Sequence, residues 1–446
     1  MIIPIIKDWV EHPPVSFAAM RLTPTLFALP ALSLATLLTH RHEHSSPRRL
    51  PDTWFQPDEH PAHALFKRAP ATDGATYDQV GSSTWSAAYP QSTPSADAMP
   101  SEWKDALAAA VSAGKIPKIP SSSNKPGENP TYPTGFDPNG NVVCSATYKC
   151  RNSGDVWDAP DGVLGVSFDD GPQPASDTLM DFLDKNNETA THFLIGVNVL
   201  QFPQQFLRAY NMGGDLAVHT CTHPYMTTLS NEDVVAQLGW TMQIIHNSSG
   251  GRVPAYWRPP FGDSDNRVRA IAKEVFGLTT VIWNQDTEDW SLTTGGTTLK
   301  AVNTSMQAWI TGPKSPGLII LEHELSEESV SAFVSAYPVM KANSWKVESL
   351  AQIIGGSSSP YQNAVGSSGE VTKADILVNN AAVSNSASGS KTASATSQPS
   401  TTTNGSGTST SASTGASTSP SGGAVTAHTF QSLGLLLSLF VPALLL

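Results

Sequence analysis

The chain has 446 residues, and only 14% of them are charged, against about 25% in an average soluble domain. Its formal net charge of −12 argues against a protein that binds nucleic acid, because such proteins present basic patches. Its three cysteines are too few for a small disulfide-dense module, so that class is excluded as well.

The first segment, residues 1–40, is predicted to be a secretory signal region. Residues 22–38 form an apolar stretch that follows a basic residue and precedes a His/Arg cluster, and Met20 is an alternative start. An N-terminal membrane anchor is the other interpretation. Pro24 and Pro30 disfavour it, because they interrupt a rather short apolar segment.

The next segment, residues 41–155, is rich in Pro, Ser and Asn, which predicts an irregular flank or a pro-region. One helix is expected within it, over Glu102–Ala113. Ser101 is its predicted cap and Gly114 its predicted end.

Residues 156–356 have a different pattern, in which short β runs alternate with helical stretches. The clearest helical stretches are Asn231–His246, preceded by a Ser230 cap, and Ser264–Phe276, which ends at Gly277. The predicted strands are Val163–Phe168, His192–Ile195, Asp215–Val218, Tyr256–Arg258, Thr279–Trp283 and Leu318–Leu321. This alternation predicts an α/β fold with a parallel sheet or a β/α barrel, in which the reactive side chains lie where strands end.

The C-terminal part predicts a stalk and a lipid anchor. Residues 357–424 are rich in Ser and Thr and nearly free of charge, as in a disordered, O-glycosylated stalk. Residues 425–446 end in an apolar tail that is short for a membrane-spanning helix. Small residues precede this tail, at Ser421, Gly422 and Gly423, an order typical of a glycosylphosphatidylinositol (GPI) attachment signal. A short tail anchor is the alternative.

A secreted, GPI-anchored protein at the plasma membrane or in the cell wall is therefore expected. Four Asn-X-Ser/Thr sequons fit that location: Asn187, Asn247, Asn303 and Asn404. In an oxidising compartment Cys144 and Cys150 are expected to pair across a short loop, which leaves Cys221 unpaired.

Five polar motifs follow predicted strands. They are SFDDGP at 167–172, HTCTH at 219–223, RPPFG at 258–262, DTEDW at 286–290 and LEH at 321–323. Adjacent carboxylates can bind a cation and accept a proton. Two histidines four apart lie on one face of a helical turn, which suits a metal. Two prolines fix the backbone of RPPFG, so that a main-chain N–H there can face an oxyanion.

Each motif also has a simpler explanation when taken alone: an Asx turn, hydrogen-bonded histidines, a rigid loop or a surface histidine. Thr220 stands where a zinc protease motif needs Glu, so that class is excluded. Cys221 points away from the ligand face of a helical turn and is expected to pack rather than to bind metal.

Together and in this order, the motifs resemble those of the polysaccharide deacetylases, carbohydrate esterase family four with NodB homology. The resemblance covers Ala159–Ile354, and the stalk and tail resemble those of secreted fungal chitin deacetylases. It implies a deformed (β/α) barrel of the NodB-homology type. It also implies one divalent metal, most often zinc, with cobalt and manganese as alternatives.

The resemblance assigns roles to single residues. Asp170, His219 and His223 match the metal ligands, and Asp169 matches the general base. Arg258 matches the residue that orients this base.

The same comparison places the remaining roles in the last three motifs. His323 matches the general acid, held by Asp289, and the backbone N–H of Phe261 matches the oxyanion donor. Trp290 and Leu321 resemble the walls of the acetyl-methyl pocket. Phe261 and Ser167 depart from the commoner Tyr and Thr.

The predicted function is metal-dependent removal of N-acetyl groups from chitin, giving chitosan and acetate. Partly deacetylated chitosan or an O-acetylated glycan such as xylan is the alternative substrate, and a non-catalytic wall mannoprotein is the alternative class. The expected partners are a chitin or chitosan polymer, cell-wall glycans and a membrane reached through the GPI anchor. The chain is expected to be a monomer that binds no nucleic acid.

Overall fold

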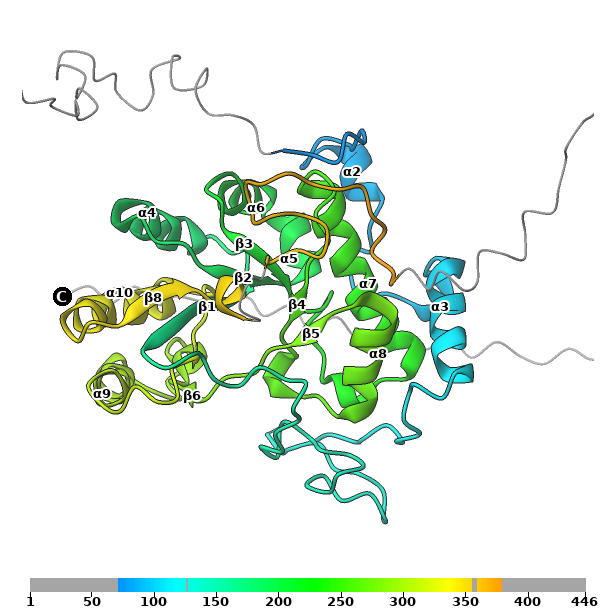
Figure 1. Ribbon diagram of the computed structural model, residues 1–446, viewed down its shortest axis with the longest axis horizontal. Coiled ribbons are helices and arrows are strands. Elements are labelled where there is room, and N and C mark those ends of the chain that lie inside the picture. The colour runs from blue at the N-terminus through cyan, green and yellow to red at the C-terminus, as the bar shows by residue number, and fades with distance from the viewer. Residues whose placement is uncertain (1–70, 126, 355–358, 379–446) are drawn as a thin grey trace, which may run out of the picture. The chain divides into compact units, whose positions relative to one another are not determined.

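The structure is a computed structural model, and it describes residues 71–125, 127–354 and 359–378 (Figure 1). The predicted signal region, the sequon at Asn404 and the lipidation residues 421–423 lie outside these ranges. Within them, no helix combines the length and the apolar character that crossing a membrane requires.

Parallel strands form the centre of the described chain. The larger sheet has the order β5-β4-β3-β2-β1-β8, and β6 and β7 pair separately. The strand bounds are β1 Val163–Gly171, β2 Thr191–Leu194, β3 Asp215–Val218, β4 Tyr256–Trp257, β5 Thr279–Thr280, β6 Gln285–Asp286, β7 Ile320–Leu321 and β8 Lys346–Ser349. Parallel bridges join Leu164 to Leu318 and Asp169 to His323, so the β7 segment lies beside β1. The predicted fold class, a deformed β/α barrel, is confirmed.

Helices cover the strands on two sides (Figure 1). On one side α4, α9 and α10 pack together, and on the other α3, α7 and α8 do so. The bounds are α2 Ser83–Ala87, α3 Ser101–Ser112, α4 Ser176–Asn186, α5 Gly196–Gln201, α6 Pro203–Asn211, α7 Asn231–Ser248, α8 Asn266–Phe276, α9 Leu299–Ile310, α10 Glu327–Ala342 and α11 Leu350–Ile353.

Alternate strand residues contribute to different parts of the core, because successive side chains of a strand point to opposite faces. Phe193 and Ala217 belong to one buried cluster. Their neighbours Leu194, Leu216 and Val218 belong to a second cluster with α3, α7 and α8.

Helix ends follow three of the four predicted signals. One of them is Gly114, which follows the C-cap residue of α3 in the left-handed conformation at φ 70°. Ser230 caps α7 through its side chain, and Gly277 ends α8 in the left-handed conformation at φ 69°. The prediction for α3 was wrong at its start. Pro100 is the N-cap residue, and Ser101 already lies in the first turn. Proline fixes the backbone φ, but it has no side-chain oxygen that could cap the helix.

The packed unit is longer than the predicted 156–356, because both flanks contribute core residues. Trp85 of α2 and Trp103 of α3 are 1% and 4% exposed, and Trp103 meets Trp240 of α7 at 5.1 Å between ring centroids. Beyond the predicted boundary, Tyr361 and Ile376 are also buried in this core. The described residues thus belong to one compact unit.

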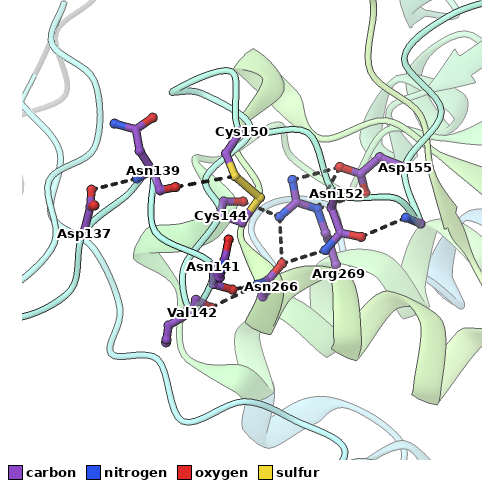
Figure 2. Close-up of a disulfide and its surroundings, with 11 residues drawn as sticks. Asp137, Asn139, Asn141, Val142, Cys144, Cys150, Asn152, Asp155, Asn266 and Arg269 are labelled. Atoms are coloured by element: carbon purple, nitrogen blue, oxygen red, sulfur yellow. Dashed lines mark hydrogen bonds and ion pairs between the residues drawn. A yellow bond between two sulfur atoms is a disulfide. The ribbon is translucent and has the colours of Figure 1, made fainter.

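The predicted disulfide is confirmed between Cys144 and Cys150 (Figure 2). Its loop is fixed to the first turns of α8. Arg269 donates to the carbonyl of Cys144, and the N–H of Asn266 donates to the carbonyl of Val143. Cys221 is free and buried, as expected.

Candidate active site

All five motifs line one cavity of about 530 Å³. Its lining includes Asp169, Asp170, His219, His223, Phe261, Asp286, Trp290, Leu321 and His323. Two other cavities, of about 620 and 610 Å³, contain none of these residues. The motifs meet because the carboxyl ends of parallel strands lie at the same end of a sheet.

Asp170, His219 and His223 form the one cluster of metal-type ligands found among the described residues, with ligand atoms within 4.8 Å of one another. Asp170 Oδ1 lies 3.4 Å from His219 Nε2 and 3.3 Å from His223 Nε2. This oxygen is buried and accepts no hydrogen bond. His219 donates its Nδ1–H to the carbonyl of Arg258 at 2.8 Å, which leaves Nε2 with its lone pair toward the cluster. These donors fit a divalent metal.

Protonation also suits metal binding here. Burial and the nearby His219 lower the pKa of His223 to about 4, so its imidazole is neutral at pH 7 and can donate a lone pair. Burial would raise the pKa of Asp170, but the neighbouring His219 and His223 outweigh burial and lower it. An anionic oxygen and a neutral ring are the forms that bind metals.

The loop between His219 and His223 is not the helical turn that the spacing predicted. Residues 219–225 have no helical assignment, and Thr220 and His223 adopt φ values of 65° and 59°. Asp170, with φ 69°, is left-handed too. The ligands therefore converge because single residues adopt the left-handed conformation. This conformation costs free energy in a non-glycine residue and persists where surrounding contacts hold it.

Two contacts that the sequence did not predict support the Asp170 turn. Asn198 donates its side-chain N–H to the carbonyl of Asp170 at 2.9 Å. The neighbouring Gly171 must lack a side chain, because a Cβ there would lie 2.1 Å from Glu324 Oε1. Glu324 in turn pairs with the buried His192 at 2.9 Å.

On one side of the metal-type cluster, Asp169 pairs with Arg258. Arg258 Nη1 donates to Asp169 Oδ1 at 2.6 Å, and the arginine is fully buried. Its guanidinium also lies 4.2 Å from the centre of the Phe193 ring. Asp169 Oδ2, the other oxygen, is 3.9 Å from His219 Nε2. One oxygen is held by arginine while the other faces the cluster, a geometry that suits a general base.

His323 pairs with Asp289 at another side of the cavity. Asp289 accepts both the ring Nδ1–H of His323, at 2.7 Å, and its backbone N–H, at 2.9 Å. Burial lowers the pKa of His323, but the charge and hydrogen bond of Asp289 outweigh burial and raise it to about 10. The imidazole therefore carries a proton at neutral pH, and its free Nε2–H can be donated.

Comparison with known proteins places this site in a family. The family described as Polysaccharide deacetylase matches residues 158–281. Chitin deacetylase 3 of Cryptococcus neoformans var. neoformans is 42% identical over 326 residues, which are 72% of this chain and 76% of that protein. The chain belongs to the polysaccharide deacetylase family.

More distant relatives match shorter parts. Chitin deacetylase 1 of Saccharomyces cerevisiae is 37% identical over 191 residues, 42% of this chain and 61% of that protein. The solved chitin deacetylase of Colletotrichum lindemuthianum is 22% identical with a TM-score of 0.42, and the match covers 46% of this chain and 93% of that one.

Aromatic side chains wall the cavity of this family member. Phe261 and Trp290 are 49% and 50% exposed, although both are large apolar residues, and Leu321 is buried. The sequence did not single out Tyr225 and Trp283, which also line the cavity. Tyr225 stacks on Phe261 with ring centroids 4.1 Å apart. The one sequence signal that Tyr225 lines the site was its position two residues after His223.

Cys221 takes no part in the metal-type cluster. It is 3% exposed, lies near Gly196 and Trp240, and does not line the active-site cavity. Burial raises the pKa of its thiol to about 12.

The three described sequons differ in their surroundings. Asn187 is exposed at the end of α4, in the left-handed conformation. Asn247 is half-buried, and its side-chain oxygen accepts from Gln243. Asn303 is also half-buried, and its side-chain oxygen accepts from Ser335.

Proposed function

We propose that the protein hydrolyses the N-acetyl groups of chitin, giving chitosan and acetate. The observation that carries this proposal is a single cavity holding a metal-type cluster, a carboxylate paired with arginine and a protonated histidine paired with aspartate. Chitin deacetylase 3 of Cryptococcus neoformans var. neoformans, which matches 72% of this chain, supports the proposal.

A divalent metal held by Asp170, His219 and His223 would supply a Lewis acid that polarises the acetyl carbonyl and acidifies water. Asp169 accepts the proton of the attacking water, and Arg258 holds this carboxylate in place.

Two further groups complete the reaction. The backbone N–H of Phe261 donates to the oxyanion that develops on the acetyl group. His323 donates its proton to the leaving nitrogen as the C–N bond breaks, so that the amine departs uncharged. Asp289 stabilises the imidazolium before this transfer and fixes its ring.

For the metal, we propose zinc, with cobalt and manganese as alternatives. Two imidazole nitrogens and one carboxylate oxygen are common zinc ligands, and three protein ligands are typical of catalytic zinc. Metal analysis of the purified protein tests this. A protein that is active with magnesium alone and carries no transition metal would contradict the proposal.

For the substrate, we propose chitin over partly deacetylated chitosan and O-acetylated xylan. The exposed Phe261 and Trp290 offer apolar faces on which sugar rings can pack. Acetate release from chitin oligomers, glycol chitin and acetyl-xylan, measured in parallel, decides among them, with His219→Ala as the inactive control. Faster acetate release from acetyl-xylan than from chitin oligomers would show that acetyl-xylan, and not chitin, is the substrate. No release from any of them would favour the structural mannoprotein.

For the location, we propose a secreted monomer anchored by GPI at the plasma membrane or the cell wall. The small residues at 421–423, followed by the apolar tail, support this, and a disulfide fits an oxidising compartment. Phosphatidylinositol-specific phospholipase C should release the protein from membranes. Recovery of a peptide from residues 433–446 in the mature protein would contradict anchoring, and a dimer in light scattering would contradict the monomer.

A further inference from the structure

The loop closed by the Cys144–Cys150 disulfide packs against the segment that follows RPPFG (Figure 2 shows the disulfide and its links to α8). The backbone N–H of Ala146 donates to the carbonyl of Ser264 at 2.8 Å. The hydroxyl of Thr147 donates to Asp263 Oδ1 at 3.2 Å. This loop precedes residues 158–281, which match the family.

Asp263 joins three segments at this point. Its fully buried carboxylate accepts the backbone N–H of Thr227 at 2.8 Å and the Thr227 hydroxyl at 2.9 Å, in addition to Thr147. Thr227 follows the metal-type ligand His223 by four residues and is also bonded to Ser122 at 2.6 Å. The carboxylate therefore ties the loop after His223, the loop after Phe261 and the disulfide loop together.

The backbone next to Asp263 is strained. Phe261 has φ 58° and ψ 10°, and Gly262 has φ 68°. A left-handed phenylalanine costs free energy and persists only where neighbouring contacts hold it. The ring of Trp283 packs on Gly262, where a Cβ would lie 3.1 Å away. Lys149 of the disulfide loop lies 5.7 Å over that same ring.

We propose that Thr147, held in the disulfide-closed loop, is a positioning residue that acts through Asp263 to aim the Phe261 N–H at the acetyl oxyanion. This inference rests on the proposed function. An oxyanion donor matters most in the transition state, so a small displacement lowers kcat and leaves ground-state binding unchanged.

The test compares Thr147→Val with Thr131→Val in the full-length, metal-loaded protein. Thr131 lies in the same N-terminal segment. Its hydroxyl bonds to the hydroxyl and the carbonyl of Ser123. Thr147→Val should lower kcat for chitin oligomers roughly tenfold, with KM and metal content unchanged, because a misplacement of about 1 Å can cost about 10²-fold in rate and a smaller one costs less. Thr131→Val should match the wild type. Thr147→Ser, which keeps the hydroxyl, should restore kcat.

The outcomes separate this inference from the proposed function. Wild-type protein that releases no acetate from any substrate refutes the function itself. Active wild type with an equally active Thr147→Val refutes only the positioning role. A loss of kcat that Thr147→Ser does not restore also refutes it, since the hydroxyl would then not be the cause.

Reduction of the wild type tests the contribution of the disulfide. Opening the loop should lower kcat in the same direction as Thr147→Val and should be reversed by reoxidation. Titration of two additional thiols confirms that the bond is open. An unchanged kcat with both thiols free would overturn the role of the closed loop.

Discussion

The adjacent carboxylates Asp169 and Asp170 should fail in different ways when each is changed to asparagine. Asp170 Oδ1 lies 3.3–3.4 Å from the Nε2 atoms of both histidines, whereas Asp169 Oδ1 is bonded to Arg258 at 2.6 Å. Asp170→Asn therefore removes the anionic ligand and should lower both metal occupancy and activity. Asp169→Asn should keep the metal and lose rate.

Two effects set the size of the Asp169→Asn change. Loss of general-base catalysis lowers kcat by about 10²–10⁴-fold. The same change leaves the fully buried Arg258 without its counter-charge. Breaking a buried ion pair costs about 3–5 kcal/mol of unfolding free energy. Asp169→Asn should therefore unfold at a lower temperature than the wild type, even with its metal bound.

The assay is metal analysis of both purified variants beside acetate-release rates and thermal unfolding. Rates are compared well below the unfolding temperature of either variant. Asp161→Asn is the matched control, because Asp161 is exposed in the turn before β1. Equal metal loss in both variants would refute the division of roles. An active Asp169→Asn would remove Asp169 as the base.

Three further predictions concern residues in or near the cavity. Asp289→Asn removes the charge that raises the pKa of His323 to about 10, so this pKa should fall and the basic limb of the pH–kcat profile should move to lower pH. An unmoved limb would exclude His323 as the acid. Cys221→Ser should keep near-normal metal content, and a loss as large as that of His219→Ala would make the thiol a ligand. Tyr225→Ala removes the ring stacked on the Phe261 wall and should raise KM for chitin oligomers severalfold, with little change in kcat; an unchanged KM would show that this ring does not contribute to binding.

The sequence predicted which motifs meet but not how their backbones are bent. Three of the motifs end strands of the larger parallel sheet, and the other two follow β6 and β7, of which the β7 segment is bridged to β1. Their convergence at one end therefore follows from topology. The spacing of His219 and His223 suggested a helical turn, because four residues bring side chains together in a helix. The actual route uses left-handed residues such as Thr220, and the sequence carries no signal for these, since glycine is the usual sign of that conformation.

The packed N-terminal segment was missed for a related reason. The helix α2 has only five residues, too few for an apolar period to be visible, yet it buries Trp85. Trp85 donates its ring N–H to Ser248 at the end of α7. Composition averaged over residues 41–155 hides such anchors, because single tryptophans rather than a repeated pattern bind this segment to the core. Long-range packing decided its structure.

The proposed base, Asp169, and the proposed acid, His323, are placed by the same backbone ladder. The N–H of Asp169 donates to the carbonyl of Glu322, and the N–H of Glu324 donates to the carbonyl of Asp169. These two bonds flank His323, so the proton acceptor and the proton donor sit at a parallel bridge between β1 and the segment after β7. Each then has its own buried partner of opposite charge, Arg258 or Asp289. One ladder therefore sets the distance between the two groups, while separate ion pairs set the charge that each carries. A change at Asp289 should therefore alter the proton transfer from His323 without moving Asp169, whereas a change at Asp169 also removes one of the charges that raise the pKa of His323.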